Sequence, residues 1–89
     1  MMTLWWMSFC DPEAPRGTQF LGVSIVAASD IIEATMEAHR LKCNPGGEIA
    51  GIGLPEEFTT AIGSEWRNRL LTKTEIAELN RLIAIQLND

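Results

Sequence analysis

The sequence predicts a single α+β domain over residues 1–89, with the element order β-β-α-β-α. Two long runs of apolar and aromatic residues near the N-terminus have the composition of strands. A segment with helical spacing of its apolar residues separates them from a third strand-like run, and a further helical segment ends the chain. Strands and helices that are mixed without strict alternation are typical of α+β domains.

The first two predicted strands cover residues 3–10 and 19–28, and a loop rich in proline and glycine joins them over residues 11–18. Because neighbouring strand residues point to opposite faces, the adjacent Trp5 and Trp6 cannot share one core. Simple alternation gives each strand two faces. The face expected under the first helix holds Trp5, Met7, Phe9, Leu21, Val23 and Ile25; the opposite face holds Trp6, Ser8, Phe20, Gly22, Ser24 and Val26.

The first helix is predicted to begin after Asp30, an N-cap residue with Glu33 three positions later in a capping-box-like pair. It should end at Asn44-Pro45, because the residue before proline avoids helical angles. The following Gly46-Gly47 predicts a turn, and residues 48–54 predict the third strand. The side of this helix expected to pack on the sheet comprises Ile31, Ala34, Thr35, Ala38 and Leu41.

Two more helices are expected in the second half. A short helix should begin at Pro55 and end before Gly63-Ser64. The segment Thr72-Lys73-Thr74-Glu75 is a capping box that predicts the final helix over residues 73–87. The apolar stripe of that helix is broad enough to pack on a core and on a neighbouring subunit, and it contains Ile76, Leu79, Leu82, Ile83, Ile85 and Leu87.

We expect these strands to form a three-stranded mixed sheet in the order 3-1-2. Strand 1 is apolar at nearly every residue and should be central, antiparallel to both neighbours. A right-handed crossover through the first helix should leave strands 2 and 3 parallel. The helices are expected mainly on one face of this open sheet. The final helix, a second subunit or a ligand would then cover the other face, because an exposed apolar patch of that size would be sticky.

Composition limits the class of protein. A chain of 89 residues has a thin core, yet 46% of its residues are hydrophobic, which predicts a homo-oligomer that buries apolar surface between subunits. The net charge of -5 argues against long nucleic acid as a partner, because binding phosphates needs clustered Lys and Arg. No apolar run reaches membrane-helix length, and the N-terminus lacks a basic leader. We therefore expect a cytoplasmic protein without a membrane partner.

No residues form a catalytic or metal-binding motif. His39 and Cys43 are four residues apart on a predicted helix and Cys10 could be a third ligand, but structural zinc takes four. Two cysteines do not make a disulfide framework, and we expect both to be reduced, packed thiols. No feature of the sequence indicates an activated Cys–His nucleophile. We predict no catalytic residue, no metal site and no cofactor.

Three groups of residues could hold a small anionic ligand. The glycines after Asn44 could let backbone N–H groups converge on an anion, and a plain helix-to-strand turn is the alternative. Two nearby arginines could clamp phosphate beside a stacking tryptophan, or they could be surface charges. A tryptophan beside two serines on the sheet could also stack a ring, or belong to the core. The predicted ligand-binding residues are Trp6, Ser8, Ser24, Asn44, Gly46, Gly47, Trp66, Arg67 and Arg69.

The segments WWMSFCDPEAPRGTQFLGV, NPGGE, LPEEF and EWRNRLLTKTEI together resemble small uncharacterised proteins of bacteria and their phages. The similarity spans most of the chain and rests on the placement of tryptophan, glycine and proline. No activity is known for that group, so the resemblance implies no site residue. A phage setting would imply, by analogy alone, a protein that counters host defence by binding a protein or sequestering a nucleotide signal.

The first hypothesis for function is a non-catalytic, oligomeric binding protein that holds a small anionic molecule, such as a nucleotide signal, at a subunit boundary. The alternative is a protein-interaction or inhibitor module that docks on a host protein through the second sheet face or the C-terminal helix. That alternative predicts a flat surface without a convergent polar pocket. A small enzyme is the third and least favoured hypothesis.

Overall fold

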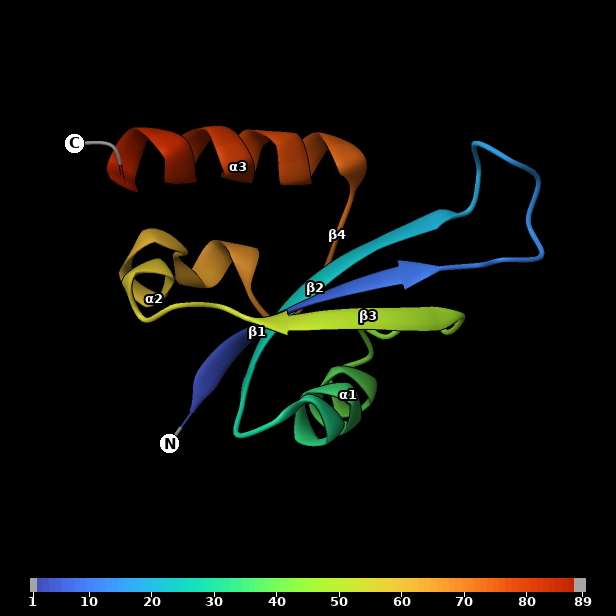
Figure 1. The fold of residues 1–89 in the computed structure, drawn as a ribbon, viewed down its shortest axis with the longest axis horizontal. Helices are drawn as coiled ribbons and strands as arrows, with labels where there is room; N and C mark the ends of the chain where they lie inside the picture. Colours follow the sequence, from blue (N-terminus) through green and yellow to red (C-terminus); the bar gives the residue numbers. More distant parts are fainter. Residues whose placement is uncertain (1, 88–89) are drawn as a thin grey trace.

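The computed structural model describes residues 2–87 and contains a four-stranded sheet with helices on both faces (Figure 1). The small α+β fold is confirmed. The predicted order of strands and helices is present, with a two-residue strand and a 3-10 turn in addition. The elements are β1 (Thr3–Cys10), β2 (Phe20–Ala28), α1 (Ile31–Arg40), β3 (Glu48–Gly53), α2 (Glu57–Ala61), the 3-10 turn η1 (Ser64–Trp66), β4 (Leu70–Leu71) and α3 (Lys73–Leu87).

The strands lie in the order β3-β1-β2-β4, and each neighbouring pair is antiparallel. β1 is central between β2 and β3, as predicted. The sheet is not the predicted three-stranded mixed sheet, for two reasons. β2 and β3 do run in the same direction, but β1 separates them, so no parallel pair forms. The fourth strand, β4, has only two residues and therefore gives no recognisable pattern in the sequence.

The assignment of residues to sheet faces was correct for β1 and wrong for most of β2. In the structure Trp5 is opposite Val26, and Trp6 is opposite Ile25. The pairing of β1 with β2 is irregular between Phe9 and Cys10, where β2 contains one extra residue next to Gly22, whose φ is +134°. Such a bulge reverses the alternation of every residue beyond it. Val23 and Ile25 therefore share a face with Trp6, while Gly22, Ser24 and Val26 share a face with Trp5.

The sheet has a separate apolar core on each face. One core lies between the sheet and α1, where two alanines of the helix allow close approach to the strands; it contains Met7, Phe9, Val26, Ala28, Ala34, Ala38 and Cys43. The other core lies between the sheet and the pair α2 and α3, on the side drawn above the sheet in Figure 1; it contains Leu4, Val23, Ile25, Ile62, Leu71, Leu79 and Ile83.

The two adjacent tryptophans are both partly buried, and each packs against a different core of its own chain. Trp5 packs at the edge of the α1 core, and its Nε1 donates a hydrogen bond to the carbonyl oxygen of Ala28 at 3.0 Å. Trp6 packs against the α2–α3 core. The expectation that the helices lie mainly on one face was therefore wrong, because α3 folds back over the second face. Of the three covers considered for that face, the final helix is the one observed, and it shares that role with the short helix α2.

Candidate functional site

The predicted ligand-binding residues lie on both sides of the sheet. Trp6 and Trp66 pack against the α2–α3 core. Ser8 is half-buried on β1, between Val23 of β2 and Ala50 of β3 in the pairing, and it shares the face of Trp6. The remaining residues belong to the α1 side or to the segments that flank α2 and η1. Within one chain, the sheet thus separates the predicted stacking residues from the glycine turn.

Arg67 stabilises the end of α2. Its Nε donates to the carbonyl oxygen of Ile62 at 3.0 Å, and its Nη2 donates to the carbonyl oxygens of Thr59 and Ile62, each at 2.6 Å. The last carbonyls of a helix have no partner within the helix, and a guanidinium is well suited to bind them. Arg67 is half-buried in this position, so three of its hydrogen bonds serve the fold.

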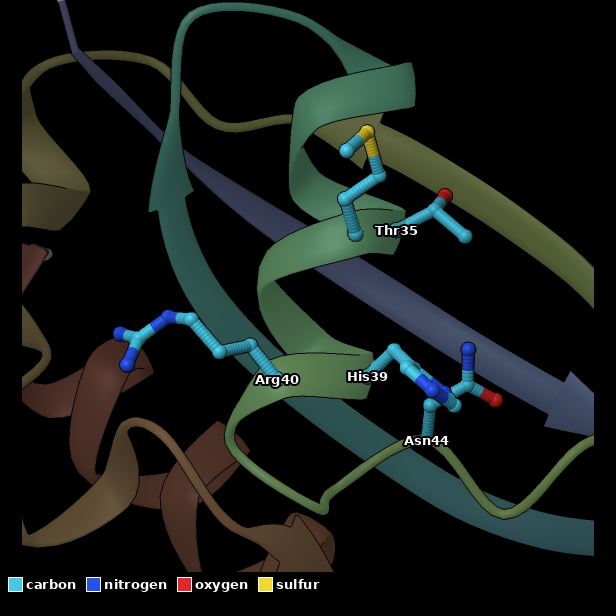
Figure 2. A pocket seen from close by; sticks show the side chains of 5 residues that line it. Thr35, His39, Arg40 and Asn44 are labelled. Carbon is cyan, nitrogen blue, oxygen red and sulfur yellow. The ribbon is translucent and has the colours of Figure 1, made fainter.

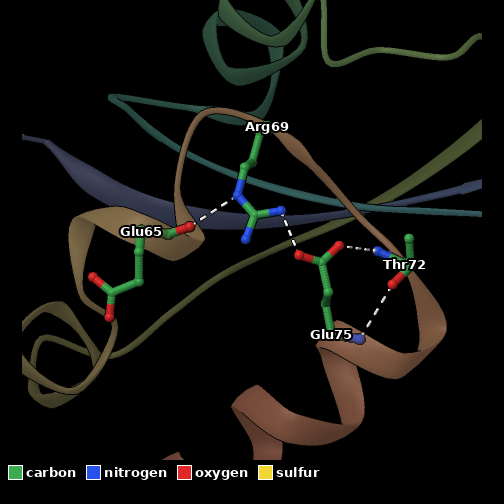
Figure 3. Close-up of polar contacts among 4 residues, drawn as sticks. All are labelled: Glu65, Arg69, Thr72 and Glu75. Atoms are coloured by element: carbon green, nitrogen blue, oxygen red, sulfur yellow. Dashed lines mark hydrogen bonds and ion pairs between the residues drawn. The ribbon is translucent and has the colours of Figure 1, made fainter.

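Arg69 links η1 to the start of α3 (Figure 3). Its Nε donates to the carbonyl oxygen of Glu65 at 2.9 Å, and its Nη1 lies 2.6 Å from Oε2 of Glu75. The guanidinium carbon is also 5.9 Å from the centre of the Trp66 ring, within the range of a cation–π contact. The structure therefore brings Trp66 and Arg69 together, with the positive charge of Arg69 compensated by a carboxylate.

Glu75 and Thr72 form the capping box predicted at the start of α3. The backbone N–H of Thr72 donates to Oε1 of Glu75 at 3.1 Å, and the backbone N–H of Glu75 donates to Oγ1 of Thr72 at 3.2 Å (Figure 3). The hydrogen bond from the Thr72 backbone, with a further contribution from Arg69, lowers the pKa of Glu75 below its usual value. This corner is charged, and its groups bond to one another.

The side chain of Asn44 closes the glycine turn between α1 and β3. Oδ1 of Asn44 accepts a hydrogen bond from the backbone N–H of Gly46 at 2.9 Å, an Asx turn. Gly46 and Gly47 have φ values of +92° and +76°. Because the first N–H group of the turn already has an acceptor, the turn offers less to an anion than the sequence pattern suggested.

Ser24, the two cysteines and His39 lie in the core or on the surface and do not come together in a site. Ser24 is fully buried, and its Oγ donates to the carbonyl oxygen of Cys43 at 2.5 Å, which joins β2 to the end of α1. Cys43 is buried, Cys10 is half-buried, and both are free thiols. His39 is exposed on α1. Among residues 2–87, no group of three or more His, Cys, Asp or Glu side chains is placed to hold a metal ion.

The structure has an exposed apolar surface that was not predicted from the sequence. Ile32 and Met36 lie one turn apart on α1 and are 71% and 68% exposed, on the side away from the buried Ala34 and Ala38. Two open, shallow hollows adjoin Met36. Figure 2 shows one of them, where Thr35, His39 and Arg40 project from α1 and Asn44 from the turn that follows. The sequence signal was present, since apolar residues occur on both sides of this helix.

We call Ile32, Met36 and the acidic residues around them, Asp30, Glu33 and Glu37, the α1 surface.

Comparison with protein-family models, with curated proteins and with solved structures finds no match to this chain. Among the described helices, none combines the length and apolar character needed to cross a bilayer.

Proposed function

We propose that the protein is a non-catalytic interaction module that binds another protein through the α1 surface. The observation that carries this proposal is the exposure of Ile32 and Met36, at 71% and 68%, on a helix whose opposite side is fully buried. Apolar side chains spaced four residues apart on one helix face are the usual anchors of a helix that docks into a groove. Open hollows, rather than a convergent polar pocket, fit a protein partner better than a small ligand.

The charges around these anchors indicate the chemistry of the partner. Asp30, Glu33 and Glu37 border the apolar residues, and one nearby cation, Arg40, forms an ion pair with Glu37. The whole chain carries a net charge of -5. We therefore expect an apolar groove with a basic rim on the partner, because complementary charges speed association and exclude wrong partners.

The helix is held in its binding-competent form before any partner arrives. Oδ1 of Asp30 accepts a hydrogen bond from the backbone N–H of Glu33 at 2.8 Å, which caps the N-terminus of α1. Ala34 and Ala38 anchor the helix on the sheet. A preformed helix loses little conformational entropy on binding, which favours affinity.

The test compares substitutions of matched charge on two helices. Ile32→Glu and Met36→Glu alter the α1 surface, and the control Ile85→Glu alters a 54% exposed residue of α3. Immobilised wild-type protein and variants are exposed to a cell lysate, and the retained proteins are quantified by mass spectrometry. We expect a partner retained by wild type and by Ile85→Glu but reduced about tenfold or more with both α1 variants. Identical retention by all variants, each folded by circular dichroism, would contradict the proposal.

A second candidate function is the binding of a small anionic molecule, such as a nucleotide signal, at a subunit boundary. The observation in its favour is the Trp66–Arg69 pair, since the Arg69 side chain is 44% exposed and lies against an aromatic ring. It is less favoured because Arg67 and Arg69 donate to backbone carbonyls and the Gly46 N–H donates to Asn44. Isothermal titration with a panel of nucleotide second messengers tests it; no measurable heat for any of them would exclude the nucleotide version.

A further inference from the structure

The outer edge of β3 presents backbone groups that pair with no other strand in the part of the chain that the structure describes. The backbone N–H of Leu54 donates to the carbonyl oxygen of Leu4 at 2.8 Å, which marks Leu4 and Leu54 as a hydrogen-bonded pair. Such pairs alternate along an antiparallel ladder, so Ile52, Ala50 and Glu48 also direct their backbone groups to β1. The groups of Ile49, Gly51 and Gly53 therefore point outward.

This edge lacks the features that usually prevent strands from associating. Residues 49–53 contain no charged residue and no proline, and the β1–β3 register runs without a bulge. Ile52 is 62% exposed and Ile49 is 38% exposed. Residues 49–53 can therefore pair with another strand without burying a charge, although β3 begins with the exposed Glu48 and the chain as a whole is acidic.

If a second copy pairs with β3 about a two-fold axis at Gly51, the residues that lie opposite each other are complementary in size. The three outward-directed residues then all form hydrogen-bonded pairs, with Gly51 opposite Gly51 and Ile49 opposite Gly53 of the partner subunit. Between them, Ile52 lies opposite Ala50 of the partner subunit. A large residue thus faces a small one on both sides of the strand pair, and Glu48 faces Leu54 of the partner subunit rather than another carboxylate.

The same axis brings apolar residues of α1 together. A Cβ atom at Gly51 would lie 2.2 Å from Cδ1 of Ile31, so the Ile31 side chain covers the space above this glycine. Hydrogen-bonded residues of an antiparallel pair have Cα atoms about 5.5 Å apart. The Ile31 side chains of the two subunits would therefore meet at the axis, on the face of the sheet that α1 covers. This contact would bury a residue that is 36% exposed in the single chain.

We propose that two copies of this chain associate through β3 into a symmetric dimer with one continuous antiparallel sheet, in which Gly51 lies on the two-fold axis. A self-complementary patch of this kind produces a closed dimer and not an open chain of subunits. The proposal does not depend on binding through the α1 surface, because it uses other residues and other variants. Such a dimer would also bury apolar surface between subunits, as the composition predicts. The buried surface would lie at the edge of the sheet and not on its second face.

Cysteine trapping tests the register. In a Cys10→Ser background, Ala50→Cys and Ile52→Cys are oxidised separately and as a mixture. A two-fold axis at Gly51 places position 50 opposite position 52 of the partner subunit, so the mixture should give disulfide-linked dimers and neither variant alone should do so. An axis at position 50 would instead link Ala50→Cys to itself. Self-linking of either variant, or no linkage in the mixture, would overturn the proposed pairing.

Light scattering across the micromolar range measures association of the unmodified chain. Ile52→Lys should weaken dimerisation about tenfold or more, because it places a charge at the exposed edge. Ile85→Lys on α3 is the matched control and should leave dimerisation unchanged. A monomer at all concentrations for the wild-type chain, or equal dimerisation of wild type and Ile52→Lys, would contradict the proposal.

Discussion

Gly46 and Gly47 are adjacent and both have positive φ, but only one of them lies against other backbone atoms. A Cβ atom at Gly47 would lie 2.2 Å from the carbonyl oxygen of Cys10, whereas a Cβ atom at Gly46 would meet nothing within 4 Å. The turn therefore needs glycine at both positions for its backbone angles, and at Gly47 also for space.

Gly46→Ala and Gly47→Ala separate these two requirements. Gly46→Ala should lower the free energy of unfolding by about 1–2 kcal/mol, because alanine is strained at positive φ. Gly47→Ala should lower it further, because the new methyl group overlaps with the end of β1. Urea denaturation of both variants measures the difference. Equal losses would show that the turn can move away from Cys10 without cost.

The capping box of α3 should make stability depend on pH. The backbone N–H of Thr72 and the Arg69 guanidinium lower the pKa of Glu75 below its usual value of 4.5. A carboxylate with a lowered pKa stabilises the folded protein above its unfolded-state pKa, and this contribution disappears as the pH falls through the folded-state pKa. Wild type should thus be more stable than Glu75→Gln at pH 7, and the difference should shrink below pH 4.5.

Denaturant unfolding of wild type and Glu75→Gln at several pH values measures this difference. Glu78→Gln is a suitable control, since it removes a carboxylate of α3 outside the cap, where it pairs with Arg81 on the surface. A stability difference between wild type and Glu75→Gln that is constant from pH 7 to strongly acidic conditions would contradict the assigned role of Glu75.

Residue types in the sequence did not distinguish a ligand site from a structural one. The sequence pattern fits Arg67 and Arg69 as phosphate clamps, but in the structure both donate to backbone carbonyls. A guanidinium binds phosphate, carboxylate and carbonyl oxygens with the same donors, so only the fold decides which acceptor lies within reach. The capping residues Asp30, Glu33, Thr72 and Glu75 were predictable, because their partners are local in the sequence.

At the scale of the element, most boundaries could be predicted and the register of β2 could not. Caps, prolines and apolar runs are local signals, and they located β1, β2, α1, β3 and α3 to within a few residues. The bulge at the start of β2 depends on one added residue beside Gly22, and nothing local requires it. One such residue exchanges the two faces of the strand, which moved Val23 and Ile25 to the side of α3.

The register predicts the effect of truncating each tryptophan. Since Trp5 and Trp6 pack against different cores, both Trp5→Ala and Trp6→Ala should lose about 3 kcal/mol or more of stability, and neither should act on binding alone. Trp5→Phe and Trp6→Phe keep the aromatic ring and should lose less, which provides variants that remain folded. Thermal unfolding followed by circular dichroism measures all of them. Full stability of Trp6→Ala would show that the α2–α3 core does not need this side chain.

At the scale of the whole molecule, β1 and β2 form one layer shared by two cores. Met7 of β1 and Val26 of β2 face α1, while Leu4 of β1 and Ile25 of β2 face α2 and α3. The sequence could not predict this arrangement, because the broad apolar stripe of α3 fits equally a core, a partner or both. Within α3, Ile83 is buried whereas Ile85 is 54% exposed. Only part of the apolar stripe of this helix therefore packs against its own chain.

A shared sheet should couple the two cores into one cooperative unit. Ile83→Val removes one methyl group from the α2–α3 core and should lower the free energy of unfolding by about 0.5–1.5 kcal/mol. If the faces unfold together, a probe on the α1 side must report the same loss. Trp5 is such a probe once Trp6 and Trp66 are replaced by phenylalanine. Its fluorescence transition should coincide with the far-ultraviolet circular dichroism transition, and Ile83→Val should shift both equally.

Ile85→Val provides the control, because it removes a methyl group from an exposed part of the same helix and should shift neither transition. A Trp5 transition that ignores Ile83→Val would mean that α3 can separate from the sheet while the α1 side stays folded. That result would be difficult to reconcile with the alternation along β1 and β2, in which each residue facing one core has neighbours facing the other. Loss of the α3 contacts exposes Val23 and Ile25, and the strand that carries them also supplies Val26 and Ala28 to the α1 core.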